Sequence, residues 1–67
     1  MKIILNNTEE QFTAQEMTIA ELLTAKNFTF RMLVIKINGQ LVKKGEYETA
    51  KLKDGDNVMV LHLISGG

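Results

Sequence analysis

Apolar and polar positions alternate along much of this chain in a way that predicts several short strands and one helix. Residues 3–5 form an apolar run that stops at Asn6 and Asn7, and asparagine tolerates the left-handed backbone of a tight turn. We therefore expect a hairpin at this point. Its returning strand is expected over residues 11–14, as a weak strand at the edge of a sheet.

The next segment has the pattern of a short amphipathic helix over residues 18–27. Thr18 and Glu21 match a capping box, in which the hydroxyl and the carboxylate each accept a hydrogen bond from a backbone amide of the first turn. Asn27 is a plausible residue at which the helix ends. Apolar side chains three and four positions apart form one face, at Ile19, Leu22 and Leu23.

A second hairpin is predicted after the helix. Odd positions are apolar from residue 32 to 37, which is typical of a strand with one face toward the core. The Asn-Gly pair at 38–39 is a strong signal for a two-residue turn, because both central residues of a type I′ turn have positive φ. Residues 40–42 are then the returning strand. A last strand is expected over 57–64, after a turn at 54–56.

Two hairpins that flank one helix predict an α+β roll, with a mixed four- to five-stranded sheet and the helix packed on one face. The last strand is apolar on both sides, so we place it at the centre of the sheet, next to the first strand. A helix of about ten residues spans only about 15 Å and covers a single face.

The other face of the sheet is therefore expected to expose apolar side chains. Strand alternation places on it Ile4, Val34, Met59, Leu61 and Leu63. A patch of this kind usually marks a protein interface, and we predict that these five residues bind a partner. The alternatives are that loops cover the patch, or that it is ordinary scatter of apolar residues.

Composition limits the classes of function. The 67 residues suffice for one domain, and eight basic residues balance eight acidic ones, so no net charge attracts nucleic acid or a membrane surface. The absence of cysteine excludes disulfides and thiolate chemistry and makes the cytoplasm the default location. The apolar run at the N-terminus is too short for a signal peptide or a spanning helix.

The C-terminal Gly66-Gly67 pair is the clearest candidate for chemistry. An α-carboxylate on an arm without side chains can enter a channel too narrow for any Cβ. We therefore divide the chain into a domain over residues 1–64 and a flexible tail over 65–67. The carboxylate is ionised and a poor electrophile, so a partner has to activate it, for example by adenylation before attack by sulfur or an amine. A frayed terminus is the alternative.

Four further features are weaker candidates: His62, Ser65, the Asp54–Asp56 turn and the Lys43–Lys44 pair. A metal site needs several converging ligands and a nucleophile needs a base within hydrogen-bond reach. We therefore expect no catalytic residue and no metal ligand. The two lysines lie in a polar loop, where they contact either solvent or the acidic rim of a partner.

The chain resembles the ThiS-type sulfur carrier proteins of thiamin biosynthesis, which are ubiquitin-like β-grasp domains. The hairpin and the Asp-Gly-Asp turn are also similar to those of the small subunit of molybdopterin synthase. The chain departs from the ThiS-type pattern at Asn7, Lys43-Lys44 and Tyr47. The resemblance covers, in order, residues 1–6, 18–23, 37–42, 52–56 and the C-terminal Gly66-Gly67.

This resemblance implies that an E1-like enzyme uses ATP to adenylate Gly67, with Gly66 in the threading part of the tail. Sulfur that comes ultimately from a cysteine desulfurase then converts the carboxylate to a thiocarboxylate, which thiazole synthase consumes. The chain itself is expected to be a monomer without a bound cofactor. Alternatives are a carrier for molybdopterin, cysteine or siderophore synthesis, a ubiquitin-like protein modifier, or an interaction module.

Overall fold

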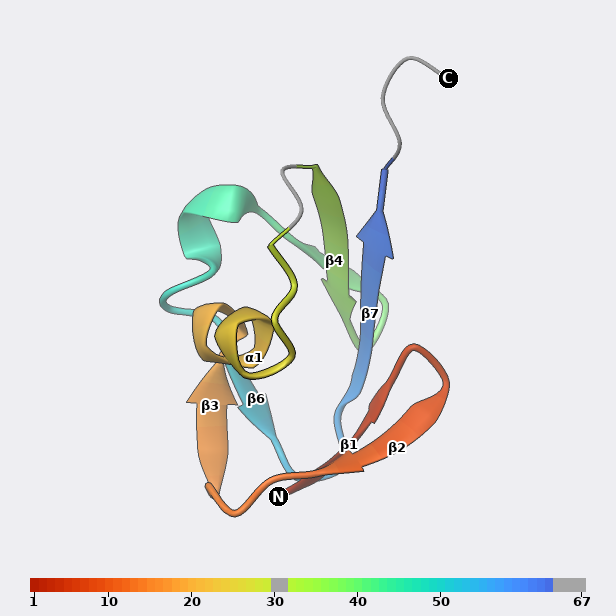
Figure 1. Ribbon diagram of the computed structural model, residues 1–67, viewed down its shortest axis with the longest axis vertical. Helices are drawn as coiled ribbons and strands as arrows, with labels where there is room; N and C mark the ends of the chain where they lie inside the picture. Colours follow the sequence, from red (N-terminus) through yellow and green to blue (C-terminus); the bar gives the residue numbers. More distant parts are fainter. Residues whose placement is uncertain (30–31, 64–67) are drawn as a thin grey trace.

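The computed structural model describes residues 1–29 and 32–63 of the chain, which form one helix layer packed on a sheet (Figure 1). In chain order the elements are β1 (Lys2–Leu5), β2 (Thr8–Gln11), β3 (Glu16–Thr18), α1 (Ile19–Ala25), β4 (Leu33–Ile37), β5 (Gln40–Val42), the 3₁₀ helix η1 (Lys44–Glu46), β6 (Lys51–Lys53) and β7 (Asn57–His62). The predicted α+β roll with a mixed sheet and a helix on one face is confirmed.

The main sheet has five strands in the order β2-β1-β7-β4-β5. The last strand, β7, lies at its centre, as the apolar pattern predicts. It runs parallel to β1, with Leu5 opposite Val58, and antiparallel to β4, with Ile35 opposite Val60. In Figure 1, β7 points away from the end of the molecule that holds the N-terminus.

The first hairpin turns at Asn6 and Asn7 as predicted, but its returning strand begins earlier than expected. The returning strand β2 is Thr8–Gln11, and the expectation of a strand over residues 11–14 is wrong. Asn6 and Asn7 have φ values of 50° and 67°. These two residues form the whole turn, and Leu5 pairs directly with Thr8. The returning strand therefore starts at Thr8, without a longer loop.

A second, two-stranded sheet was not anticipated from the sequence. It pairs β3 with β6 in antiparallel fashion, with Met17 opposite Leu52. Each strand has three residues, and only the central residue of β6 is buried. Segments this short carry too little periodicity to distinguish a strand from a loop.

Helix α1 begins directly after the predicted cap Thr18 and ends at Ala25, two residues before the predicted end. The Thr18 hydroxyl accepts from the amide of Glu21 at 3.1 Å, and the Glu21 carboxylate accepts from the amide of Thr18 at 2.8 Å. Asn27 has a φ of 58° just after the helix, which is the left-handed conformation that ends many helices. The described part of the chain contains no helix long and apolar enough to span a membrane.

The core lies between α1 and the sheet. The helix contributes Ile19 and Leu22, both fully buried. Leu33 and Ile37, at odd positions of β4, are partly buried and pack against the core. The buried residues are Ile3, Leu5, Ile19, Leu22, Ile35, Val42, Leu52, Val58 and Val60. Every odd-numbered apolar residue of β1 and β4 therefore faces the helix, and the predicted assignment of the faces is confirmed.

Candidate functional site

The C-terminal tail leaves the domain from the central strand of the sheet. Ser65, Gly66 and Gly67 lie outside the described residues, so the division into a domain over 1–64 and a tail over 65–67 stays a prediction. The last described residue is Leu63, whose backbone amide donates to the carbonyl of Met32 at 3.0 Å. The tail therefore starts from a backbone position that is already held by the sheet.

A side chain extends the support of β7 beyond the end of β1. The amide of Val60 donates to Asn6 Oδ1 at 2.8 Å, and Asn6 Nδ2 donates to the carbonyl of Val60 at 3.1 Å. The turn directs the backbone away from the sheet at this point. The Asn6 carboxamide thus makes the two hydrogen bonds to β7 that the backbone of a further β1 residue would make. As a result β7 is bonded on both sides up to Val60, three residues before the last described one.

The five residues predicted to bind a partner lie on the face of the sheet that α1 leaves uncovered. Val34 is opposite Leu61 in the β4–β7 ladder, and residues opposite one another point to the same face. Ile4, Val34 and Met59 are half-buried. Leu61 and Leu63 are each 45% exposed and lie closest to the tail. That these residues contact a partner stays a prediction.

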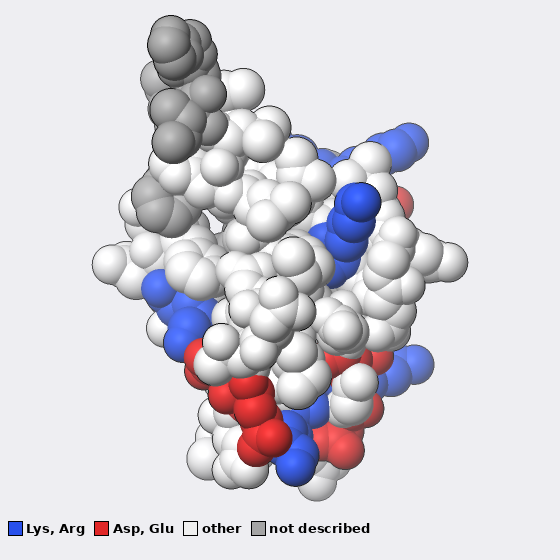
Figure 2. All heavy atoms as spheres, turned by 90° about the vertical axis from the view of Figure 1, so that its right-hand side faces the viewer, with Lys and Arg blue, Asp and Glu red and all other residues white. Residues whose placement is uncertain are grey.

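Two exposed apolar residues of this region were missed from the sequence. Leu41 is 60% exposed and Met32 is 47% exposed. Leu41 is opposite Lys36 on the open face, so the alternation of the second hairpin would have placed it there. Figure 2, which views the molecule from the side of β7 and β2, shows mostly uncharged side chains with some basic ones over the upper half, and both acidic and basic side chains in the lower half.

A groove of about 590 Å³ opens beside the base of the tail, and we name it the tail-base groove. Lys43 and Lys44 line it together with apolar side chains from both layers of the fold. Tyr47, one of the positions at which the chain departs from the ThiS-type pattern, is half-buried and forms part of the wall. The apolar side chains include Leu23, Phe28, Leu33, Leu41, Tyr47 and Leu63. The groove and the open face therefore meet at Leu63.

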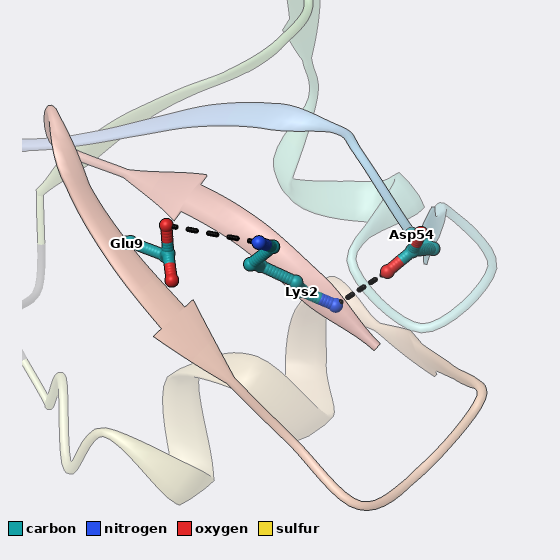
Figure 3. Close-up of polar contacts among 3 residues, drawn as sticks. All are labelled: Lys2, Glu9 and Asp54. Carbon is teal, nitrogen blue, oxygen red and sulfur yellow. Dashed lines mark hydrogen bonds and ion pairs between the residues drawn. The ribbon is translucent and has the colours of Figure 1, made fainter.

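The Asp54–Asp56 turn binds backbone amides. Asp54 Oδ1 accepts from the amide of Lys2 at 2.7 Å, while the Lys2 ammonium lies 3.9 Å from Glu9 (Figure 3). Asp56 accepts from the amide of Lys53 at 2.9 Å and from Asn38 Nδ2 at 3.0 Å. Both carboxylates thus join the start of β1, the second hairpin and the start of β7, at the end of the sheet opposite the tail.

Among the described residues, no cluster of side chains could hold a metal ion. His62 is an exposed residue of β7, and no group of three or more His, Asp or Glu side chains converges in this part of the chain. No buried side-chain polar atom of the described residues lacks a hydrogen-bond partner. The arrangement instead presents an apolar face and a groove next to a strand that leads to the C-terminal carboxylate.

Solved structures with this arrangement are known. A crystal structure of the thiamine biosynthesis protein ThiS from Geobacter metallireducens superposes with a TM-score of 0.89 at 25% identity, and each chain is covered completely. A solution structure of a thiamine biosynthesis protein from the same organism gives a TM-score of 0.81 at 25% identity, covering all of this chain and 88% of the other.

Comparison of sequences leads to the same family. A thiazole synthase from Paramagnetospirillum magneticum is 31% identical over 67 residues, which is all of this chain and 20% of that protein. The chain therefore spans about a fifth of the length of this curated relative. A model of the ThiS family matches residues 2–67, nearly the whole sequence. On this match and the full-length structural similarity, the chain belongs to the ThiS family.

Proposed function

We propose that this chain is a sulfur carrier in thiamine biosynthesis, with the C-terminal carboxylate of Gly67 as the group that holds sulfur. The observation that carries the proposal is the match of the ThiS family to residues 2–67, because it includes both the fold and the Gly66-Gly67 terminus. ThiS is a small sulfur carrier rather than a catalyst.

The chemistry follows from the carboxylate. Attack of its oxygen on the α-phosphorus of ATP releases pyrophosphate and forms an acyl adenylate, in which AMP is a good leaving group. Hydrosulfide then attacks the carbonyl carbon, the bond to AMP breaks, and loss of a proton leaves sulfur in place of one oxygen of Gly67. A protein persulfide in place of hydrosulfide gives an acyl disulfide, whose S–S bond a thiol then reduces to release the thiocarboxylate. We assign both steps to the active sites of partner proteins.

The proposed partners are an E1-like adenylating enzyme, a sulfur donor such as a cysteine desulfurase, and thiazole synthase as the acceptor. ATP is the co-substrate of the adenylating enzyme and is not bound by the carrier. A thiazole synthase that contains a segment similar to the whole of this chain supports the choice of acceptor. The absence of cysteine from the sequence supports a cytoplasmic location.

The experiment that tests the proposal is intact-mass spectrometry of the purified protein after incubation with the adenylating enzyme of the same organism, ATP and a sulfur source. We expect a mass increase equal to the exchange of one oxygen for one sulfur, located in the C-terminal peptide. Omission of ATP should abolish the increase. An adenylating enzyme that is active on another carrier but leaves this chain unchanged would contradict the proposal.

A further inference from the structure

The lysines of this chain differ in whether they have a partner. Among the described residues, three pairs bring a lysine ammonium within 4.0 Å of a carboxylate: Lys2–Glu9, Lys26–Glu10 and Lys51–Glu16. Lys43 and Lys44 form no such pair with a described residue. The nearby Glu46 carboxylate accepts a hydrogen bond from the backbone amide of Lys43 at 3.0 Å. This bond orients the carboxylate toward the backbone.

Both lysines lie at an apolar groove. Lys43 and Lys44 follow β5 directly and line the tail-base groove next to Leu41, which is 60% exposed. Lys36 is opposite Leu41 on β4, so a third exposed lysine lies on the open face beside the groove. No acidic residue is among the described side chains that line the groove. This surface therefore offers an apolar recess next to positive charge.

The length of the tail limits where an enzyme that acts on Gly67 can lie. Four residues, 64–67, follow Leu63 in the sequence, and four residues span at most about 14 Å when fully extended. Leu63 is itself part of the groove wall. An active site that receives the C-terminal carboxylate must therefore come within about 14 Å of the groove.

We propose that the tail-base groove binds an acidic segment of the adenylating enzyme, which inserts an apolar side chain beside Leu41 and places carboxylates against Lys43 and Lys44. The proposal rests on the proposed function and names the contact that presents the tail for activation. In the proposed function adenylation is the first step at Gly67, so it is the first step that needs the tail to be presented. An apolar anchor in a groove supplies affinity, while charges at the rim mainly set the association rate and its dependence on salt.

Calorimetric binding of the full-length protein to the purified adenylating enzyme, without ATP, tests the contact separately from the chemistry. Lys44→Glu should raise Kd about tenfold at low ionic strength, and the difference should shrink as salt screens the charges. Lys53→Glu is the matched control. It makes the same change of charge at an exposed lysine on β6 that does not line the groove, and Kd should stay within about twofold.

Leu41→Gln is the variant for the apolar part of the contact. Leu41 is mostly exposed, so the melting temperature should be unchanged while Kd rises at every salt concentration. Circular dichroism of each variant confirms that it is folded. Equal weakening by Lys44→Glu and Lys53→Glu would overturn the proposal, because only net charge would then matter. Unchanged binding of both Lys44→Glu and Leu41→Gln would also overturn it.

Two further measurements show what occupies the groove and whether the groove matters for sulfur transfer. A dimer seen by sedimentation at the concentrations used, and lost in Lys44→Glu, would mean that a second copy of the chain occupies the groove, which contradicts the proposal. The wild type and Lys44→Glu can also be compared for conversion to thiocarboxylate when the carrier is limiting. Equal efficiency would contradict binding of the adenylating enzyme at the groove and leave the carrier function intact. Failure of the wild type to be converted contradicts the carrier function itself.

Discussion

The side chain of Asn6 holds Val60 by two hydrogen bonds, in which Asn6 Oδ1 accepts from the Val60 amide and Asn6 Nδ2 donates to the Val60 carbonyl. Asn6 has a φ of 50° and belongs to the turn, so the same residue reverses the chain and continues the sheet. Val60 lies on the strand that leads to the tail. The turn of the first hairpin is thereby connected to the part of the molecule proposed to carry sulfur.

Replacing Asn6 with glycine should lower the free energy of unfolding by about 1–3 kcal/mol, since the amide and carbonyl of Val60 lose their partner. Glycine accepts positive φ, so the change isolates the hydrogen bonds from backbone strain. Urea denaturation measures the effect. Asn7→Gly is the control, because Asn7 also has positive φ and its side chain forms no hydrogen bond within the described residues. Equal effects of the two changes would mean that the contact to Val60 is not stabilising.

Replacing Gly66 with tryptophan should abolish thiocarboxylate formation and leave the melting temperature unchanged. The physical reason is that the proposed channel of the adenylating enzyme admits a chain without Cβ atoms, whereas an indole is far too wide. Intact-mass spectrometry and thermal denaturation give the two readouts. Gly45→Ala serves as a control, because a Cβ at Gly45 meets nothing within 4 Å. A Gly66 variant that unfolds would show that the tail belongs to the folded domain.

Leu61→Asp tests the open face of the sheet. Because Leu61 is 45% exposed, the change should reduce the free energy of unfolding by less than about 1 kcal/mol, while binding to the adenylating enzyme or thiazole synthase weakens measurably. Ile35→Ala on the opposite face is the comparison, with an expected loss of about 2–5 kcal/mol, since Ile35 is fully buried. A large loss of stability in Leu61→Asp, with unchanged binding by the folded fraction, would contradict the interface.

Asp56→Ala should destabilise the fold by about 1.5–3 kcal/mol, because the amide of Lys53 and Asn38 Nδ2 both lose a charged acceptor. Asp56→Asn should recover part of the loss, since it keeps one acceptor oxygen. Thermal denaturation of the wild type with and without millimolar Ca²⁺ or Mg²⁺ completes the test. A rise in melting temperature with either cation that is absent in Asp56→Ala would instead indicate a metal site at this turn.

Local signals in the sequence predicted much of the fold. The capping box of Thr18 and Glu21 and the Asn-Gly turn at 38–39 act over two to four residues, so their geometry depends little on the rest of the chain. The apolar character of residues 57–62 likewise placed the last strand at the centre of the sheet. The expectation of a return strand over 11–14 was wrong because β2 is polar. A polar segment has the sequence pattern of a loop, and only its pairing with β1 identifies it as a strand.

The sequence by itself determined the fold class, the face that carries the core, and the Gly66-Gly67 terminus on which the proposed chemistry depends. Only the tertiary structure decided the contact of Asn6 with Val60, the pairing of β3 with β6, and the meeting of Leu41 and Leu63 at one groove. Contacts between residues far apart in the chain, hydrogen bonds included, produce no periodic pattern in a single sequence. They depend on how the elements pack and not on the spacing of residues along the chain.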